Sequence, residues 1–125
     1  MDSVKLYIGS EFAGSTEWMS LLKENVKGLN VDLFSENTQI KEECDFILYV
    51  FTPNSDGVST IINAVNDSNH LKEKTIFCVL SEVFDEKFTS HQEKSLIAAG
   101  KMIELNGGNW FKNMDEVLEF IVRTK

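Results

Sequence analysis

"DFILYVFT", Asp45–Thr52, is the most apolar run in the chain, and the polar stretch "PNSDG" follows it directly. A strand that is covered on both faces has this near-continuous apolar pattern, which is typical of the centre of a parallel sheet. The next segment, "VSTIINAVNDSN", places apolar residues at the spacing of a helix: Val58, Ile61, Ile62 and Val65. We therefore expect a buried strand, a tight turn, and a helix that turns this stripe toward the sheet.

The same alternation extends outward in both directions along the chain. Further strands are expected at "VKLYIG" (Val4–Gly9), "NVDLF" (Asn30–Phe34), "KTIFCVL" (Lys74–Leu80) and "KMIEL" (Lys101–Leu105). Helices are expected over residues 15–27 with Gly28 as the stop, from a capping box at Ser90–Glu93 to Gly100, and from a second capping box at Asn113–Glu116 onward. The polar segment 35–44 is expected to form a short helix or an irregular turn.

Five strands that alternate with helices predict an α/β fold, a single doubly wound parallel sheet of order 2-1-3-4-5 with helices on both faces. The 125 residues fit one domain spanning 1–125. In this order the first and third strands are neighbours, and their carboxyl ends meet at the topological switch point. Ligands of such folds bind in the crevice at that point, so the loops "GSEFAGS" and "TPNSDG" are the candidate site.

Composition narrows the class of partner. A net charge of −8 disfavours duplex nucleic acid and anionic membranes, which both require clustered Lys and Arg. No apolar run is long enough to cross a bilayer, and the N-terminus "MDSVKLYIGS" lacks the features of a signal peptide. Cys44 and Cys78 lie beside or inside apolar runs without a C-x-x-C motif, which predicts two reduced, buried thiols and fits a cytoplasmic protein.

The two candidate loops carry weak chemical signals of their own. Small residues such as Gly9 and Ser10, before an expected helix start, could receive an anion or could simply form a turn. The helix after "PNSDG" has a polar face that is expected to be solvated: Ser59, Asn63, Asn66, Asp67 and His70. His70 and His91 have no cysteine or carboxylate at ligand spacing, so we expect neither a metal site nor a cofactor.

Longer segments nevertheless resemble a known family. "CDFILYVFTPNSDGVSTIINAVNDSN", "KTIFCVL", "HQEKSL" and the opening "KLYIGSEF" with "STEW" are similar to nucleoside 2-deoxyribosyltransferase-like proteins, which have a flavodoxin-like fold. The resemblance implies cleavage of the N-glycosidic bond of deoxynucleosides or nucleotides through a nucleophilic glutamate. It also implies that Tyr7 positions this glutamate. The expected ligand-binding residues are Gly9, Ser10, Glu11, Asp56, Gly57 and Ser59, with the register of Asp56 fixed only to within about a residue.

This chain departs from the family pattern where chemistry is expected. The glutamate position falls on Asn63, whose neutral amide is a poor nucleophile. The arginine that usually follows Ser-Thr-x-Trp is Met19, and the segment between the second and third strands is shortened. The first hypothesis is therefore a nucleoside- or nucleotide-binding protein with weak or no transferase activity.

Two alternatives remain at this stage. The chain could be an active glycosidase or transferase that uses Glu11, Asp56 or Asp67 instead. It could also be a protein-interaction module that retains only the fold. Because family members commonly assemble, the resemblance further implies a homo-oligomer.

Overall fold

The computed structural model describes residues 4–9, 17–34, 41–51, 58–80, 82–83 and 86–124. Its strands are β1 (Val4–Ile8), β2 (Val31–Phe34), β3 (Phe46–Phe51), β4 (Thr75–Val79), β5 (Glu82–Val83), β6 (Glu86–Lys87) and β7 (Asn109–Phe111). Its helices are α1 (Glu17–Val26), α2 (Val58–His70), α3 (Ser90–Leu105) and α4 (Met114–Thr124), with short 3₁₀ turns η1 (Lys41–Glu43) and η2 (Lys72–Lys74).

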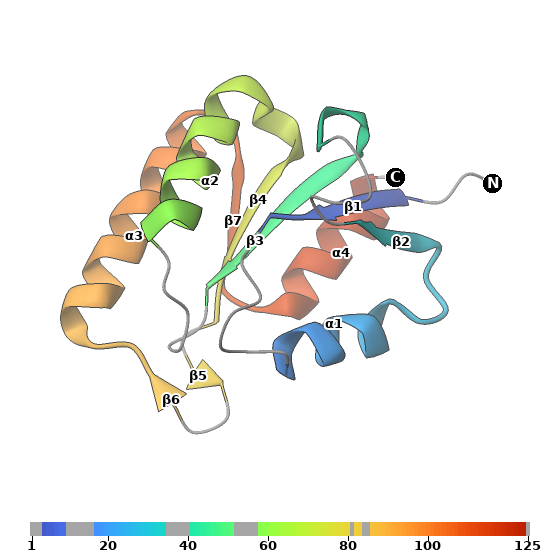
Figure 1. Ribbon diagram of the computed structural model, residues 1–125, viewed down its shortest axis with the longest axis horizontal. Coiled ribbons are helices and arrows are strands. Elements are labelled where there is room, and N and C mark those ends of the chain that lie inside the picture. Colours follow the sequence, from blue (N-terminus) through green and yellow to red (C-terminus); the bar gives the residue numbers. More distant parts are fainter. Residues whose placement is uncertain are drawn as a thin grey trace.

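Five strands form one all-parallel sheet in the order β2-β1-β3-β4-β7. This confirms the predicted α/β class and the order 2-1-3-4-5, with β7 as the fifth strand. Figure 1 shows α2 and α3 over one face of the sheet and α1 and α4 over the other. The chain therefore has the three-layer architecture of flavodoxin-type proteins, with β1 beside β3 at the switch point.

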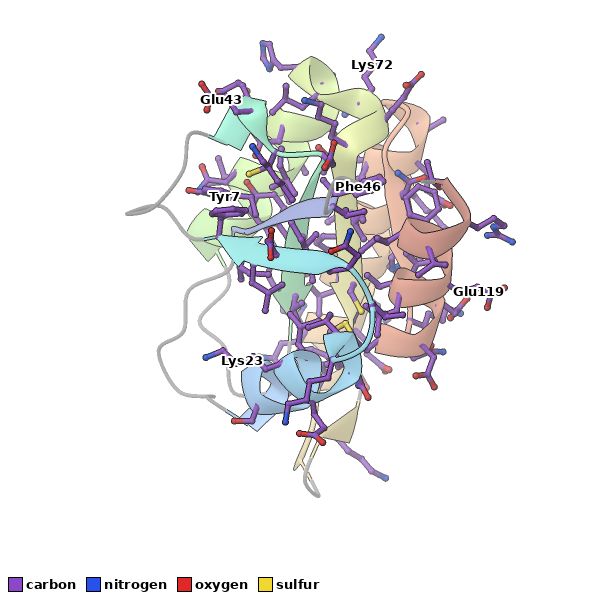
Figure 2. All side chains as sticks on the ribbon, turned by 90° about the vertical axis from the view of Figure 1, so that its right-hand side faces the viewer. Tyr7, Lys23, Glu43, Phe46, Lys72 and Glu119 are labelled. Atoms are coloured by element: carbon purple, nitrogen blue, oxygen red, sulfur yellow. The ribbon has the colours of Figure 1, made fainter. Side chains whose placement is uncertain are left out.

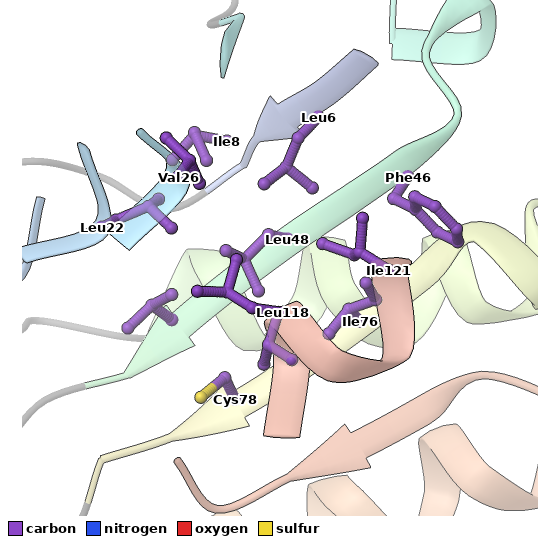
Figure 3. Close-up of a cluster of buried hydrophobic side chains, with 12 residues drawn as sticks. Leu6, Ile8, Leu22, Val26, Phe46, Leu48, Ile76, Cys78, Leu118 and Ile121 are labelled. Carbon is purple, nitrogen blue, oxygen red and sulfur yellow. The ribbon is translucent and has the colours of Figure 1, made fainter. Parts of the chain in front are cut away.

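The alternation of side chains along each strand builds two hydrophobic cores. On one face, Leu6, Leu48 and Ile76 pack with residues of α1 and α4, as Figure 3 shows. On the other face, Ile47 and Phe77 pack with residues of α2 and α3. Figure 2 shows that neighbouring strands send Tyr7 and Phe46 to opposite sides of the sheet. All six side chains of β3 are buried, as its apolar sequence predicts.

The fifth strand was predicted in the wrong place. "KMIEL" is not a strand but the last part of α3, which runs on to Leu105 and places Ile103 in the core. Lys, Met, Glu and Leu are all good helix formers. The stop comes at Asn106 and Gly107, where Gly107 adopts a φ of 101° and donates its N–H to the carbonyl of Glu104 at 3.0 Å.

The start of α3 also differs from the prediction by one residue. The N-cap is Thr89, not Ser90: its Oγ1 accepts from the Gln92 N–H at 3.1 Å, and the Gln92 side chain accepts from the Thr89 N–H at 2.9 Å. At the start of α4 the predicted N-cap Asn113 is confirmed, whereas its second bond with Glu116 runs to the Asn113 side chain and not to the backbone N–H of a capping box. Asn113 Oδ1 accepts from the Glu116 N–H at 2.9 Å, and Glu116 Oε1 accepts from the Asn113 side-chain amide at 2.9 Å.

One further element lies outside the predicted sheet. β5 and β6 pair in antiparallel fashion as a separate two-stranded element after β4, which the sequence reading did not include. Cys44 and Cys78 are buried free thiols, as expected. None of the helices in the described ranges has the length and apolarity that crossing a membrane requires.

Candidate functional site

The predicted site residues fall into two groups. Ser10, Glu11, Asp56 and Gly57 lie outside the described residues, and Ser59 belongs to α2 but its side chain is not described. Gly9, Tyr7 and Asn63 lie within the described part of the chain. Gly9 directly follows β1, and its N–H donates to the carbonyl of Leu48 at 2.9 Å, which continues the pairing of β1 with β3.

The described residues beside this switch point contain a buried polar pair. The hydroxyl of Tyr49, in the middle of β3, donates a hydrogen bond to Oδ2 of Asp67 on α2. Tyr49 is 1% exposed and Asp67 is 4% exposed. A buried carboxylate is costly unless hydrogen-bond donors satisfy it, so Tyr49 offsets part of the desolvation of Asp67 and joins α2 to the centre of the sheet.

Glycine at position 9 is required by the ring of Tyr49. A Cβ placed on Gly9 would lie 2.5 Å from Cε1 of Tyr49, well inside contact distance. The backbone at the end of β1 therefore lies directly against this aromatic ring. The resemblance assigned Gly9 to ligand binding, and the geometry gives it a packing role as well.

Tyr7 lies on the same face of the sheet as Tyr49. It is 9% exposed and belongs to the core that α2 and α3 cover.

Burial raises the pKa of Tyr49 well above its ordinary value, and the hydrogen bond to Asp67 and the charges of Asp67 and Tyr7 raise it further. The Tyr49 phenol is therefore held as a neutral hydrogen-bond donor at physiological pH.

Asn63 occupies the exposed flank of α2. With about 100° between successive helical residues, Asn63 lies one turn before Asp67 and on the side of α2 away from Val65. Its side chain is exposed, and its amide has no hydrogen-bond partner among the described residues. Because α2 is connected to the carboxyl end of β3, its first turns lie nearest the switch point, so the Asn63 amide is accessible there.

The buried position of Asp67 corrects the predicted faces of α2. The sequence reading placed Ile62 in the core stripe and Asp67 on the solvated face, but Ile62 is 62% exposed and Asp67 is buried. The fully buried residues of α2 are small or polar, Ala64, Asp67 and Ser68, while Ile61 and Val65 of the predicted stripe are partly buried and pack against the same core. Ala64 and Ser68, four residues apart, mark this face in the sequence, although they are less hydrophobic than the aliphatic residues of α2.

Other polar groups in the described ranges have structural roles. Asp45 accepts from the Lys5 N–H at 2.8 Å and donates its own N–H to the Lys5 carbonyl at 2.8 Å, which joins β3 to β1 at the amino edge of the sheet. The described residues contain no cluster of three or more His, Cys, Asp or Glu side chains that could hold a metal ion.

Comparison with protein-family models, with curated proteins and with solved structures finds no match to this chain.

Proposed function

We propose that the chain binds a nucleoside, a nucleotide or a related ribosyl ligand at the carboxyl ends of β1 and β3, with weak transferase activity or none. The observation that carries the proposal is the Asn63 amide, which is exposed and has no partner within the described ranges, on the α2 flank nearest the switch point. An amide both donates and accepts hydrogen bonds, which suits the hydroxyl groups of a sugar.

The same residue argues against efficient catalysis. The resemblance implies a glutamate at this position, where its carboxylate would trap an oxocarbenium-like centre. A neutral amide supplies neither the nucleophile nor the compensating negative charge. Losing one preorganised electrostatic contact typically costs a factor of about 10²–10³ in rate, and losing the nucleophile costs more.

A thermal-shift and calorimetric screen of nucleosides, nucleotides and nucleotide-derived signals tests the binding proposal. We expect at least one compound to bind, and Asn63→Ala to weaken that binding. Asn69→Ala is the matched control, because Asn69 is also an exposed asparagine of α2 but lies nearly two turns further along the helix and on a different side of it. Absence of binding across the panel would contradict the proposal.

The Tyr49–Asp67 pair supports a second candidate, an enzyme that uses Asp67. A carboxylate held by a tyrosine hydroxyl has the composition of a glycosidase nucleophile pair, although Asp67 is only 4% exposed and must become accessible to react. Chromatography of deoxynucleosides incubated with the protein decides between the candidates. Release of free base that disappears in Asp67→Asn, with folding retained, favours the enzyme.

Asn63→Glu separates these candidates further. Restoring a carboxylate at the position that the resemblance implies should create base release where the natural protein has none. Asn63→Gln, which has nearly the same size but no charge, is the control. Activity in Asn63→Glu alone would support the family assignment and the inactive state of the natural chain.

A further inference from the structure

A pocket of about 230 Å³ lies at the carboxyl ends of β4 and β7, away from the switch point between β1 and β3. Its described lining residues are Val79, Glu93, Leu96, Ile97, Trp110 and Lys112. Carboxyl ends of parallel strands are the edge where α/β proteins bind ligands. A binding site here does not depend on Asn63 or on the proposed function.

Two sequence periods bring the lining residues together. Four residues of α3 share the i, i+3, i+4, i+7 spacing of a single helix face: Glu93, Leu96, Ile97 and Gly100. On β7, Trp110 packs against the core that α2 and α3 cover, and Lys112, one residue beyond the strand, follows it at the spacing of the same sheet face. The pocket therefore lies between one face of α3 and the end of β7.

The interior of the pocket is apolar. Leu96 is buried, whereas Ile97 beside it is 43% exposed. The Trp110 indole lies against the α3 backbone at Gly100, where a Cβ would be 2.5 Å from its Cδ2. A cavity of about 150 Å³ holds benzene, so a pocket of about 230 Å³ has room for one phenyl ring or a branched aliphatic side chain. Such a group would also remove the apolar surface of Ile97 from water, which is favourable.

Two opposite charges line the same pocket. Glu93 lies in the first turns of α3 and Lys112 directly after β7, and both are exposed. Figure 1 shows that α3 begins at the edge of the sheet where β4 ends. Within the described ranges, neither side chain forms a hydrogen bond or an ion pair, with the other or with a third residue. Both charged groups can therefore contact a ligand.

This arrangement suits a ligand that carries both charges itself. A positive group on the ligand can donate to the Glu93 carboxylate, and a negative group can accept from the Lys112 ammonium. A ligand with only one charge leaves the other side chain without a partner, and the net charge of −8 further disfavours an anion. A zwitterion engages both side chains and carries no net charge.

We propose that this pocket binds a free α-amino acid with a bulky apolar side chain. That side chain packs on Leu96, Ile97 and Trp110, the ammonium group contacts Glu93, and the carboxylate contacts Lys112. L-Phenylalanine is the probe. Phenethylamine is the matched probe without the carboxylate, and hydrocinnamate is the matched probe without the ammonium group.

The test is a titration at millimolar ligand concentrations, followed by the backbone amide resonances in a ¹H–¹⁵N spectrum. We expect phenylalanine to shift the amides of Leu96, Ile97 and Lys112 in a saturable way. Each matched probe should bind at least about threefold more weakly, because each lacks one charge-assisted contact. The amides around Asn63 should not shift, which separates this site from the proposed nucleoside site.

Two variants assign the two charges. Glu93→Gln should weaken the binding of phenylalanine and phenethylamine at least about threefold, but not that of hydrocinnamate. Lys112→Met should weaken phenylalanine and hydrocinnamate to a similar extent, but not phenethylamine. The matched controls are Glu104→Gln, at the other end of α3, and Lys23→Met, on α1 at the other face of the sheet. They change the net charge equally and should leave the binding of all three probes unaltered.

Three results would overturn the proposal. The first is the absence of a saturable phenylalanine shift at the pocket. The second is binding of phenethylamine or hydrocinnamate as tight as that of phenylalanine. The third is that Glu93→Gln or Lys112→Met binds the three probes no differently from its control.

Discussion

Asp67 of α2 accepts a hydrogen bond from the hydroxyl of Tyr49 in β3, and both side chains are buried. The bond crosses from a helix to the central strand of the sheet, beneath the end of β1 where Gly9 packs on the Tyr49 ring. The orientation of α2, and with it the position of Asn63, therefore depends on this pair.

Tyr49→Phe should destabilise the protein, because it removes a hydrogen-bond donor from a buried carboxylate. We expect a loss of about 1–3 kcal/mol in the free energy of unfolding, measured by urea denaturation. Asn66→Ala, an exposed change on the same helix, should cost less than about 0.5 kcal/mol. Equal stabilities of Tyr49→Phe and the natural chain would show that the bond contributes nothing.

The same pair predicts how stability depends on alkaline pH. Burial raises the pKa of Tyr49 above its unfolded value of 10.0, so the folded state favours the protonated phenol. This contribution is fully present below pH 10.0 and is lost as the pH rises above it.

Urea denaturation between pH 8 and pH 11 should therefore show a shallower alkaline decline for Tyr49→Phe than for the natural chain. Burial also raises the pKa of Cys78, to about 12, with the same sign of effect. Cys78 is present in both proteins, so the difference between their pH profiles isolates Tyr49. Identical slopes would argue that Tyr49 is not buried as a neutral phenol.

Gly100→Ala tests the contact between α3 and β7. Alanine favours a helix over glycine by about 1 kcal/mol, but here its methyl group would lie 2.5 Å from the Trp110 ring. Overpacking of this kind costs about 1–3 kcal/mol, so we expect a net loss in urea denaturation. In a Trp110→Leu background the clash is gone and the same change should stabilise. A gain in the stability of Gly100→Ala in the natural background would contradict the packing of Trp110 against α3.

The two residues at the start of α3 give a matched pair of substitutions. Thr89→Ala removes the N-cap oxygen that accepts from the Gln92 N–H at 3.1 Å, and should cost about 1 kcal/mol. Ser90→Ala should be nearly neutral or slightly stabilising, because alanine is the better helix former at that position. If Ser90→Ala lowered the melting temperature more than Thr89→Ala did, the sequence-based assignment of Ser90 as the N-cap would be restored.

The fold was predictable because its signals are local and strong. β3 is a run of apolar residues that only a doubly covered strand explains, and Gly28 ends α1 with a φ of 83° as predicted. The end of α3 was not predictable in the same way. Gly100 looks like a helix stop in sequence, but it lies inside α3, and its contact with Trp110, ten residues later, explains why a glycine stands there.

The site was less predictable than the fold, since burial of a polar residue depends on its partner. Nothing in the neighbours of Asp67 along the chain indicates that Tyr49 will meet it from a strand 18 residues earlier. Asn63 was assigned from the resemblance, and its exposed, unpartnered amide within the described ranges is compatible with that assignment. Its role remains a proposal.

The most direct test of that proposal is a calorimetric titration of the natural chain and of Asn63→Ala with 2′-deoxynucleosides and their monophosphates. Chromatography of the recovered ligand follows the titration. We predict that at least one compound binds with one site per chain, is recovered intact, and binds Asn63→Ala about fivefold more weakly, as expected for one hydrogen bond. The account is contradicted if no compound binds, or if the bound nucleoside is recovered as free base and sugar.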